Sequence, residues 1–373
     1  MKFLYGYLCL VFLILFHELG HFFAAKIFHV KVESFSIGIG PVLLHKKIKG
    51  TDWRISLIPL GGYCGMKGEK EIQKALDENL PYIEAEPDSL YGVNSFKRAL
   101  IGFAGPFFNF ILAVTAFTII NAVGYEYITF SNKINVIEST NEISYPACEA
   151  GLQDGDIIIQ INNKKISDFS DIQEMIITKP DKSFQITVLR NDEELQFNLK
   201  SILNKETGQG LIGITNDPES IIKKHTPEYN FFQSIGHGIK DSIDYLGASI
   251  RGIASLFKGA SLKNSVSGPV RVAEIMGSTL EDGFKISFSV GIVSSLQILG
   301  LISISLFMMN LLPVPLLDGG LILMALIEGI FRKKIKPKIH YYIQFIGLAF
   351  ILVMFVIAIF GDISYFIGRG KLK

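Results

Sequence analysis

The segment from Phe3 to Ala25 is almost unbroken hydrocarbon and is long enough to cross a bilayer as one helix. Three ionisable residues lie inside this segment, within about one helical turn of one another: His17, Glu18 and His21. A carboxylate at the centre of such a helix costs roughly 2.5–3.5 kcal/mol, so a membrane segment rarely carries one without a use. The run is longer than the apolar core of a signal peptide, and no small-residue cleavage site follows it. The sequence therefore predicts that residues 1–25 form a retained transmembrane helix with a functional polar site.

The spacing of the two histidines indicates metal binding. His17 and His21 are four residues apart, so on a helix their imidazoles lie on one face and can hold a single Zn²⁺. Glu18 lies beside them, where its carboxylate can accept a proton from water, as in the H-E-x-x-H pattern of metalloproteases. The alternative is a chance match in which both histidines pack against neighbouring helices.

The composition indicates membrane segments together with at least one soluble domain. Of the 373 residues, 49% are hydrophobic and 19% charged, with a mean hydropathy of +0.36. This is too apolar for an ordinary soluble protein and too charged for a bare helical bundle. The net charge of +1 offers no basic excess to neutralise phosphates, so no nucleic-acid partner is expected. The three cysteines are scattered and form neither a disulfide framework nor a C-x-x-C zinc site.

Three further apolar stretches complete a predicted polytopic helical membrane protein with about four transmembrane helices: residues 96–123, 286–330 and 340–367. Basic residues crowd the loop after the first helix, from Lys26 to Arg54, and the loop Phe331–Lys338. By the positive-inside tendency, both loops are expected on the cytoplasmic side and the N-terminus outside. The histidine pair is then expected in the cytoplasmic half of the membrane.

The cytoplasmic loop 26–95 is predicted to contain a small membrane-associated β-hairpin region. Apolar and polar residues alternate in Val32–Pro41 and Trp53–Tyr63, and the glycines Gly61 and Gly62 are turn signals in the second segment. An exposed strand edge near a protease centre could hold an extended substrate by β-addition, which makes both glycines candidate substrate contacts. The alternative is a purely structural sheet. Residues 67–95 are polar and acid-rich and are predicted to be a mobile loop.

The second helix, residues 96–123, carries small residues three apart at Gly102 and Gly105, which allow close contact with another helix. Asn109 lies in the same apolar run and needs a hydrogen-bond partner there. Two partners are open for this amide: another helix or a substrate backbone.

Residues 126–214 have the composition of a soluble α+β domain, which the second crossing places outside the cytoplasm. Alternation and turn residues predict two strands, a helix and a hairpin: Ile134–Ile137, Asp156–Ile161, Phe169–Ile177, and Phe184–Leu189 with Glu194–Leu199. The segment 225–285 is amphipathic and too polar to span, so it is predicted to lie at the outer membrane surface, with a linker free of the membrane as the alternative.

The third apolar region, residues 286–330, is broken by the prolines and glycines between Asn310 and Gly320. Irregular backbone survives at membrane depth only where it is buried or lines a wet cavity. Asp318 is the only carboxylate between Asp282 and Glu328. An isolated membrane aspartate is a functional candidate, and its natural partner here is the metal. We expect Asp318 to be the third ligand; capping of the following helix is the alternative and is compatible with ligation.

Two resemblances follow from these motifs. Pro146–Ile158, followed by Ile161–Lys164, resembles the core of a bacterial PDZ domain. Such a domain would bind an extended peptide or act as a steric filter. The H-E-x-x-H motif, Gly105-Pro106-x-x-Asn109, the PDZ core, and the segment with Asn310, Pro313 and Leu317–Gly319 together resemble the site-2 protease family of intramembrane zinc metalloproteases, in its bacterial PDZ-bearing form.

This resemblance implies Zn²⁺ on His17, His21 and Asp318, Glu18 as general base, and Asn109, Asn310 and Pro313 near the substrate. It also implies a location in the bacterial inner membrane. The chain has space for one PDZ domain, so filtering by a tandem pair cannot be assumed.

The expected activity is cleavage of transmembrane segments of single-pass membrane proteins, within the lipid bilayer, after a first cut outside. Anti-sigma factors and remnant signal peptides are both open as substrates, and the oligomeric state cannot be inferred. A non-enzymatic PDZ membrane scaffold is the alternative, but it predicts loss of Glu18 or of a ligand. Metal transport would need more polar residues along several helices.

Overall fold

The computed structural model describes residues 2–139, 144–204, 209–256 and 268–370. The chain divides into two compact units. Within the described residues, the first unit comprises 2–122, 229–246 and 268–370, and the second comprises 123–139, 144–204, 209–228 and 247–256. The apolar helices belong to the first unit, and the second is an α+β domain.

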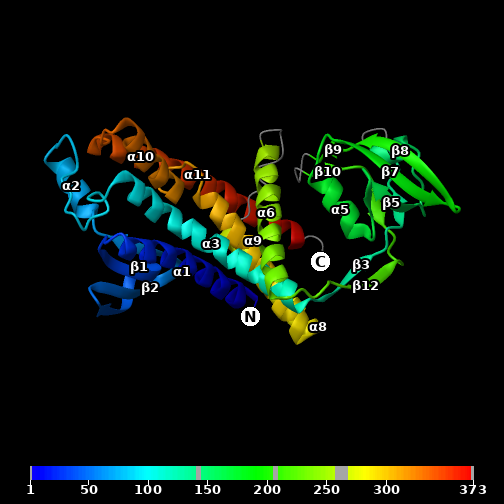
Figure 1. The fold of residues 1–373 in the computed structure, drawn as a ribbon, viewed down its shortest axis with the longest axis horizontal. Helices are drawn as coiled ribbons and strands as arrows, with labels where there is room; N and C mark the ends of the chain where they lie inside the picture. The colour runs from blue at the N-terminus through cyan, green and yellow to red at the C-terminus, as the bar shows by residue number, and fades with distance from the viewer. Residues whose placement is uncertain (1, 140–143, 205–208, 257–267, 371–373) are drawn as a thin grey trace. The chain divides into compact units, whose positions relative to one another are not determined.

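In the described part of the chain, four helices are long and apolar enough to cross a membrane (Figure 1). They are α1 (Lys2–Ile27), α3 (Ser95–Val123), α9 (Phe288–Asn310) and α11 (Pro337–Gly370). The bounds of α1, α3 and α11 lie close to those expected from the apolar runs, whereas α9 ends at Asn310 and covers only the first part of the expected region 286–330. These helices agree with the prediction of a polytopic helical membrane protein.

Small residues allow α1 and α3 to approach closely. A Cβ on Gly20 of α1 would lie 2.8 Å from the carbonyl carbon of Ala104 and 3.0 Å from the Cα of Gly105 on α3. Close backbone contact of this kind is a main source of helix association in membranes, where lipid tails are as apolar as side chains. A buried apolar cluster also joins α1, α3 and α8 (Pro269–Ile286), and its fully or nearly buried members are Leu13, Leu112 and Met276.

The strands β1 (Val32–Ile48) and β2 (Thr51–Met66) form one long antiparallel hairpin that folds back on itself. Phe35 pairs with both Trp53 and Cys64, so this part of β1 has a neighbour on each side. The register gives four segments side by side, in the order 42–48, 51–58, 32–39 and 62–66. Residues 62–66 therefore form one edge of the hairpin sheet.

The stretch 67–95, predicted to be a mobile loop, contains the helix α2 (Glu69–Asp77). Lys67 forms ion pairs with Glu86 and Asp88, each with an N–O distance of 2.6 Å. The prediction took the polar, acid-rich composition as the sign of a loop, but α2 forms with one small buried residue, Ala75, and Lys67 joins two of the acidic residues.

A turn at residues 311–317 separates α9 from α10 (Asp318–Phe331), so the apolar region 286–330 is two helices, as its prolines and glycines predicted. A Cβ on Gly319 would lie 2.6 Å from the carbonyl carbon of Leu311, and one on Gly320 would lie 2.8 Å from the Cα of Pro315. The two glycines therefore let the turn pack against the start of α10. Asp318 is the first residue of that helix.

The second unit contains a four-stranded antiparallel sheet in the order β6-β5-β7-β8. These strands are Lys164–Lys165, Ile157–Ile161, Ser183–Arg190 and Glu193–Lys200. The short helix α4 (Pro146–Glu149) and α5 (Phe169–Ile177) complete it, and Asp168 caps α5 by accepting from the N–H of Asp171. Apolar side chains of β5, β7 and α5 form its core: Ile158, Ile161, Ile186, Val188 and Ile172.

Three pairs of short strands extend this unit: β3 (Glu126–Phe130) with β12 (Ile221–His225), β4 (Ile134–Val136) with β11 (Ile214–Asn216), and β9 (Ile202–Leu203) with β10 (Gly210–Leu211). The predicted domain, 126–214, therefore ends too early, because β12 pairs with the first strand. Residues 140–143 and 205–208 of that range lie outside the described residues.

The segment 225–285, predicted to be one amphipathic interfacial stretch, holds two helices, α6 (Phe231–Leu256) and α8; its residues 257–267 lie outside the described ones. The start of α6 packs on the end of α3, where the Asn121 amide donates to Asp241 at 2.8 Å. A Cβ on Gly6 of α1 would lie 2.8 Å from the carbonyl carbon of Ala273 on α8. Both helices are thus held by protein contacts that the amphipathic pattern alone did not predict.

Candidate metal centre

Three side chains that are far apart in the sequence meet in the first unit. His17 and His21 lie on α1, and Asp318 begins α10. The Nε2 of His17 is 3.1 Å from Asp318 Oδ2, the Nε2 of His21 is 3.1 Å from Oδ1, and the two Nε2 atoms are 3.3 Å apart. Both histidines are buried, and Asp318 is half-buried. Among the residues that the structure describes, this is the one group of three or more histidine, cysteine or carboxylate side chains whose ligand atoms converge in this way.

These distances fit a tetrahedral metal site. When an ion binds nitrogen and oxygen ligands at about 2.0–2.1 Å, tetrahedral geometry places the ligand atoms about 3.3 Å apart. The three observed separations of 3.1–3.3 Å match that spacing. Three protein ligands also leave a fourth position open, as a catalytic zinc site requires. The residues predicted as ligands are therefore placed together in a geometry that suits zinc.

Contacts with α3 fix the ring of His21. Its Nδ1–H donates to the carbonyl of Ile101 at 2.8 Å, so the neutral ring carries its lone pair on Nε2, the atom that faces Asp318. Gly105 lies against the same ring. A Cβ on Gly105 would lie 2.6 Å from Cε1 of His21, 2.8 Å from Cδ2, and closer still to Nε2. This ring position therefore requires glycine at 105.

His17 is held by Asn109 of α3, which is fully buried. The Asn109 amide is 3.1 Å from Nδ1 of His17, while Oδ1 of the amide has no hydrogen-bond partner among the described residues. Amide nitrogen and oxygen are assigned from the hydrogen-bond network, and exchanging them gives Oδ1 the Nδ1–H donor that it lacks. His17 then presents Nε2 to the metal position. Of the two partners considered for Asn109, another helix or a substrate backbone, the structure shows another helix, because His17 lies on α1.

Glu18 is half-buried beside the edge of the hairpin sheet. The segment of β2 that includes Gly62 and Cys64 lies close to its carboxylate. A Cβ on Gly62 would lie 3.5 Å from Cγ of Glu18 and 2.8 Å from the carbonyl oxygen of Ser36. The sheet edge 62–66 thus runs directly beside the predicted general base. Burial raises the pKa of the Cys64 thiol to about 12. Among the described residues, the ligand atoms that converge are those of His17, His21 and Asp318, without this thiol.

The other predicted substrate residues lie on segments that lead to the centre. Gly61 has a φ of 117° and precedes the sheet edge. Asn310 is the half-buried last residue of α9, and Pro313 is exposed in the turn before Asp318. Their contact with a substrate stays a prediction.

Sequence reasoning missed two contributors, the Ile101 carbonyl and the contact of Gly105 with His21. The spacing of the small residues on α3 signalled close approach to another helix, but not which atom would be approached.

Comparison with known proteins agrees with this geometry. Residues 5–354 match the model of peptidase family M50. A protein of Treponema pallidum, named as a candidate zinc metalloprotease, is 33% identical, with 98% of this chain and 99% of that protein covered. Proteins with the same kind of name from Campylobacter jejuni and Helicobacter pylori are 35% and 32% identical, covering 99% and 97% of this chain and 95% and 99% of those proteins.

A solved structure, the PDZ domain of HtrA3 bound to a phage-derived ligand, aligns with 27% of this chain and 91% of that chain at 18% identity. Its TM-score of 0.14 is too low to support an argument about fold.

The family model spans most of the chain, and these relatives match the chain over nearly their whole length. The resemblance predicted from His17, Glu18, His21 and Asp318 is thereby confirmed at the level of the family. The chain belongs to peptidase family M50, the site-2 protease family, and is a membrane metalloprotease of that type.

Proposed function

We propose that this protein binds zinc through His17, His21 and Asp318 and hydrolyses peptide bonds in or near the transmembrane segments of single-pass membrane proteins. The observation that carries the proposal is the convergence of two Nε2 atoms and one carboxylate within 3.1–3.3 Å of one another, with Glu18 on the same helix. The zinc metalloprotease names of the relatives support the choice of metal.

Zinc in this position supplies Lewis acidity toward a scissile carbonyl and toward water. Glu18 accepts the proton of the attacking water and passes it to the leaving amine. Asn109 and the Ile101 carbonyl keep the two histidine rings oriented.

The substrate must present an extended segment, because the amides of an intact helix are shielded by their own hydrogen bonds. The edge 62–66 of the hairpin sheet lies next to Glu18 and offers backbone groups for strand addition, with Gly61 and Gly62 at its start. Asn310 and Pro313 come shortly before Asp318 in the chain, at the end of α9 and in the turn that follows it, and are proposed to contact the unwound segment.

The proposed location is the bacterial inner membrane, with the centre toward the cytoplasm and the α+β unit outside it. The basic loops after α1 and between α10 and α11 support this orientation by the positive-inside tendency. The α+β unit is proposed to be a PDZ domain that excludes bulky ectodomains. Substrates would then be shortened outside by another protease before they reach the centre.

The test is cleavage of a tagged single-pass model substrate by the purified full chain in detergent. Glu18→Gln should slow cleavage by about 10²–10⁴-fold, because it removes the general base, while metal analysis finds the bound zinc retained. Glu33→Gln, an exposed carboxylate of β1, is the matched control and should cleave like the wild type. Equal processing by the wild type and Glu18→Gln would remove Glu18 from the mechanism.

A further inference from the structure

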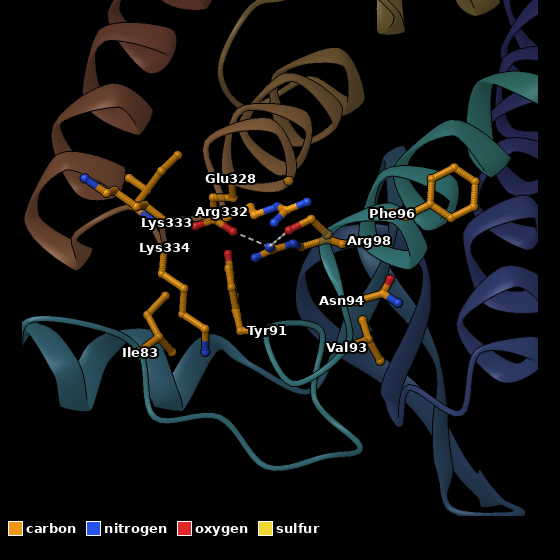
Figure 2. Close-up of a pocket in the computed structure, with 13 residues that line it drawn as sticks. Ile83, Tyr91, Val93, Asn94, Phe96, Arg98, Glu328, Arg332, Lys333 and Lys334 are labelled. Atoms are coloured by element: carbon orange, nitrogen blue, oxygen red, sulfur yellow. Dashed lines mark hydrogen bonds and ion pairs between the residues drawn. The ribbon is translucent and has the colours of Figure 1, made fainter.

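A cavity of about 420 Å³ lies in the first unit, apart from the metal centre (Figure 2). The segment before α3, the first turn of α3, and the end of α10 with the loop after it line this cavity. Its walls include Tyr91, Arg98, Glu328, Arg332, Lys333 and Lys334. None of the proposed catalytic steps uses these residues.

The cavity has a strong excess of positive charge. Among the described residues that line it, four are basic and one, Glu328, is acidic. Arg98 pairs with Glu328, and Figure 2 shows these two side chains pointing toward one another. Arg332, Lys333 and Lys334 are exposed, and within the described residues no ion pair joins them to a carboxylate. The positive charge of these three side chains is therefore available to bind an anion.

Arg98 forms part of the cavity wall through a buried side chain that pairs with Glu328. Its side chain is only 8% exposed, yet its Nε has no hydrogen-bond partner among the described residues. The Nε is itself buried, so it does not face the cavity, and the exposed cations Arg332, Lys333 and Lys334 carry the anion site. Tyr91 covers the guanidinium at 5.4 Å from ring centroid to Cζ, which holds it at the cavity wall.

The place of the cavity indicates which anion it takes. It lies where α3 begins at Ser95, where α10 ends at Phe331, and just before α11 begins at Pro337. Two of these helices are membrane-length, so the cavity lies at the level where they leave the hydrocarbon. Basic pockets between transmembrane helices at this level bind lipid phosphates.

The apolar part of the lining favours a lipid over free phosphate. Phe96, which is 68% exposed, together with Val93 and Ile335, adds hydrocarbon surface to the basic walls. An ion would use only the cations, whereas a phospholipid uses both surfaces.

We propose that this cavity binds the phosphate headgroup of an anionic phospholipid. The phosphate contacts Arg332, Lys333 and Lys334, while an acyl chain lies against Phe96. This site is independent of peptide hydrolysis, so it stands or falls separately from the proposed protease activity.

The test is lipid titration of the delipidated full chain in detergent, followed by native mass spectrometry. Phosphatidylglycerol should bind at least tenfold more tightly than phosphatidylcholine. The triple variant R332Q/K333Q/K334Q should lose that preference, because its cations contact the phosphate. The charge-preserving variant R332K/K333R/K334R should keep it, which separates charge from any effect on folding.

A matched control removes three exposed lysines of the hairpin, K46Q/K47Q/K49Q, with the same change in net charge. Preserved lipid preference in this control supports the cavity; equal loss in both triple variants would overturn it, since binding would then follow overall charge. Equal binding of the two lipids by the wild type would also overturn the proposal. Displacement of phosphatidylglycerol by millimolar inorganic phosphate would assign the site to a free anion and refute the lipid.

Discussion

Replacement of Gly105 by alanine tests the packing on which the metal centre depends. The new Cβ would lie 2.6 Å from Cε1 of His21 and 2.8 Å from Cδ2, where ordinary van der Waals contact begins at 3.4 Å. The ring must therefore retreat by about 0.6–0.8 Å, and its Nε2, which lies closer, by more. Protein zinc sites hold their bond lengths within about ±0.2 Å, so a shift of this size breaks the ligand geometry.

We expect Gly105→Ala to weaken zinc binding by at least about 100-fold, or roughly 2.8 kcal/mol, the upper end of what a disturbed ligand environment costs. The fold should survive, because alanine is a better helix former than glycine. The assay is zinc titration of the purified full chain against a chelating dye, with circular dichroism as the check on helix content.

Gly102→Ala is the matched control, one turn earlier on α3. A Cβ there would lie 3.1 Å from Cγ1 of Ile322 and 3.3 Å from Cδ2 of Leu321, which are side-chain atoms that can give by a few tenths of an ångström, and 3.6 Å from the backbone oxygen of Asp318, which is an ordinary van der Waals contact. Its zinc affinity should stay within a few-fold of the wild type. Wild-type affinity in Gly105→Ala, or an equal loss in Gly102→Ala, would refute the reasoning.

Three further predictions use other parts of the molecule. Asn109→Leu removes the partner of His17 and should lower zinc affinity about 10–100-fold in the same titration, while Asn109→Asp, which can accept the Nδ1–H, should lose less; equal losses would contradict the assigned hydrogen bond. In the second unit, burial would raise the pKa of Asp168, but hydrogen bonds from Lys224 and the N–H of Asp171 outweigh it and hold the pKa below its usual value. The stabilisation by Asp168 is therefore present above about pH 4, the unfolded pKa, and is lost as the pH falls through the folded pKa. Asp168→Asn should therefore reduce the fall of Tm at acidic pH, and an unchanged fall would exclude this contribution. A zinc chelator should lower the Tm of the wild type, because it removes a ligand that binds the folded state; a constant Tm would mean that bound zinc does not stabilise the fold.

The three converging side chains could be predicted from the sequence because a membrane penalises unused charge. His17 and His21 are recognisable by their spacing, and Asp318 by its isolation in an apolar region. The atoms that orient these side chains could not be predicted in the same way. The contact of Gly105 with His21 depends on how α1 and α3 are rotated against one another, and helical periodicity does not determine that rotation.

The fold shows the same division between local and non-local information. The helix α5 has its predicted bounds, Phe169–Ile177, because a capping aspartate and an apolar face define it locally. The double pairing of Phe35 was not predictable, since alternation of apolar and polar residues indicates a strand but not its neighbours. The edge that borders Glu18 follows from that non-local pairing.

Two links hold α3 and α10 together around the centre. The first link is His21 of α1, which donates a hydrogen bond to the carbonyl of Ile101 on α3 and lies against Asp318 on α10. One turn before Ile101, the buried pair of Arg98 and Glu328 joins the same two helices. A buried ion pair adds little net stability, because desolvation offsets its attraction, but breaking one partner is costly, so it is well suited to fixing the register of two helices. The hairpin side of the centre has the strand edge 62–66 beside Glu18, and this contrast supports our proposal that an extended substrate enters along the sheet rather than between α3 and α10.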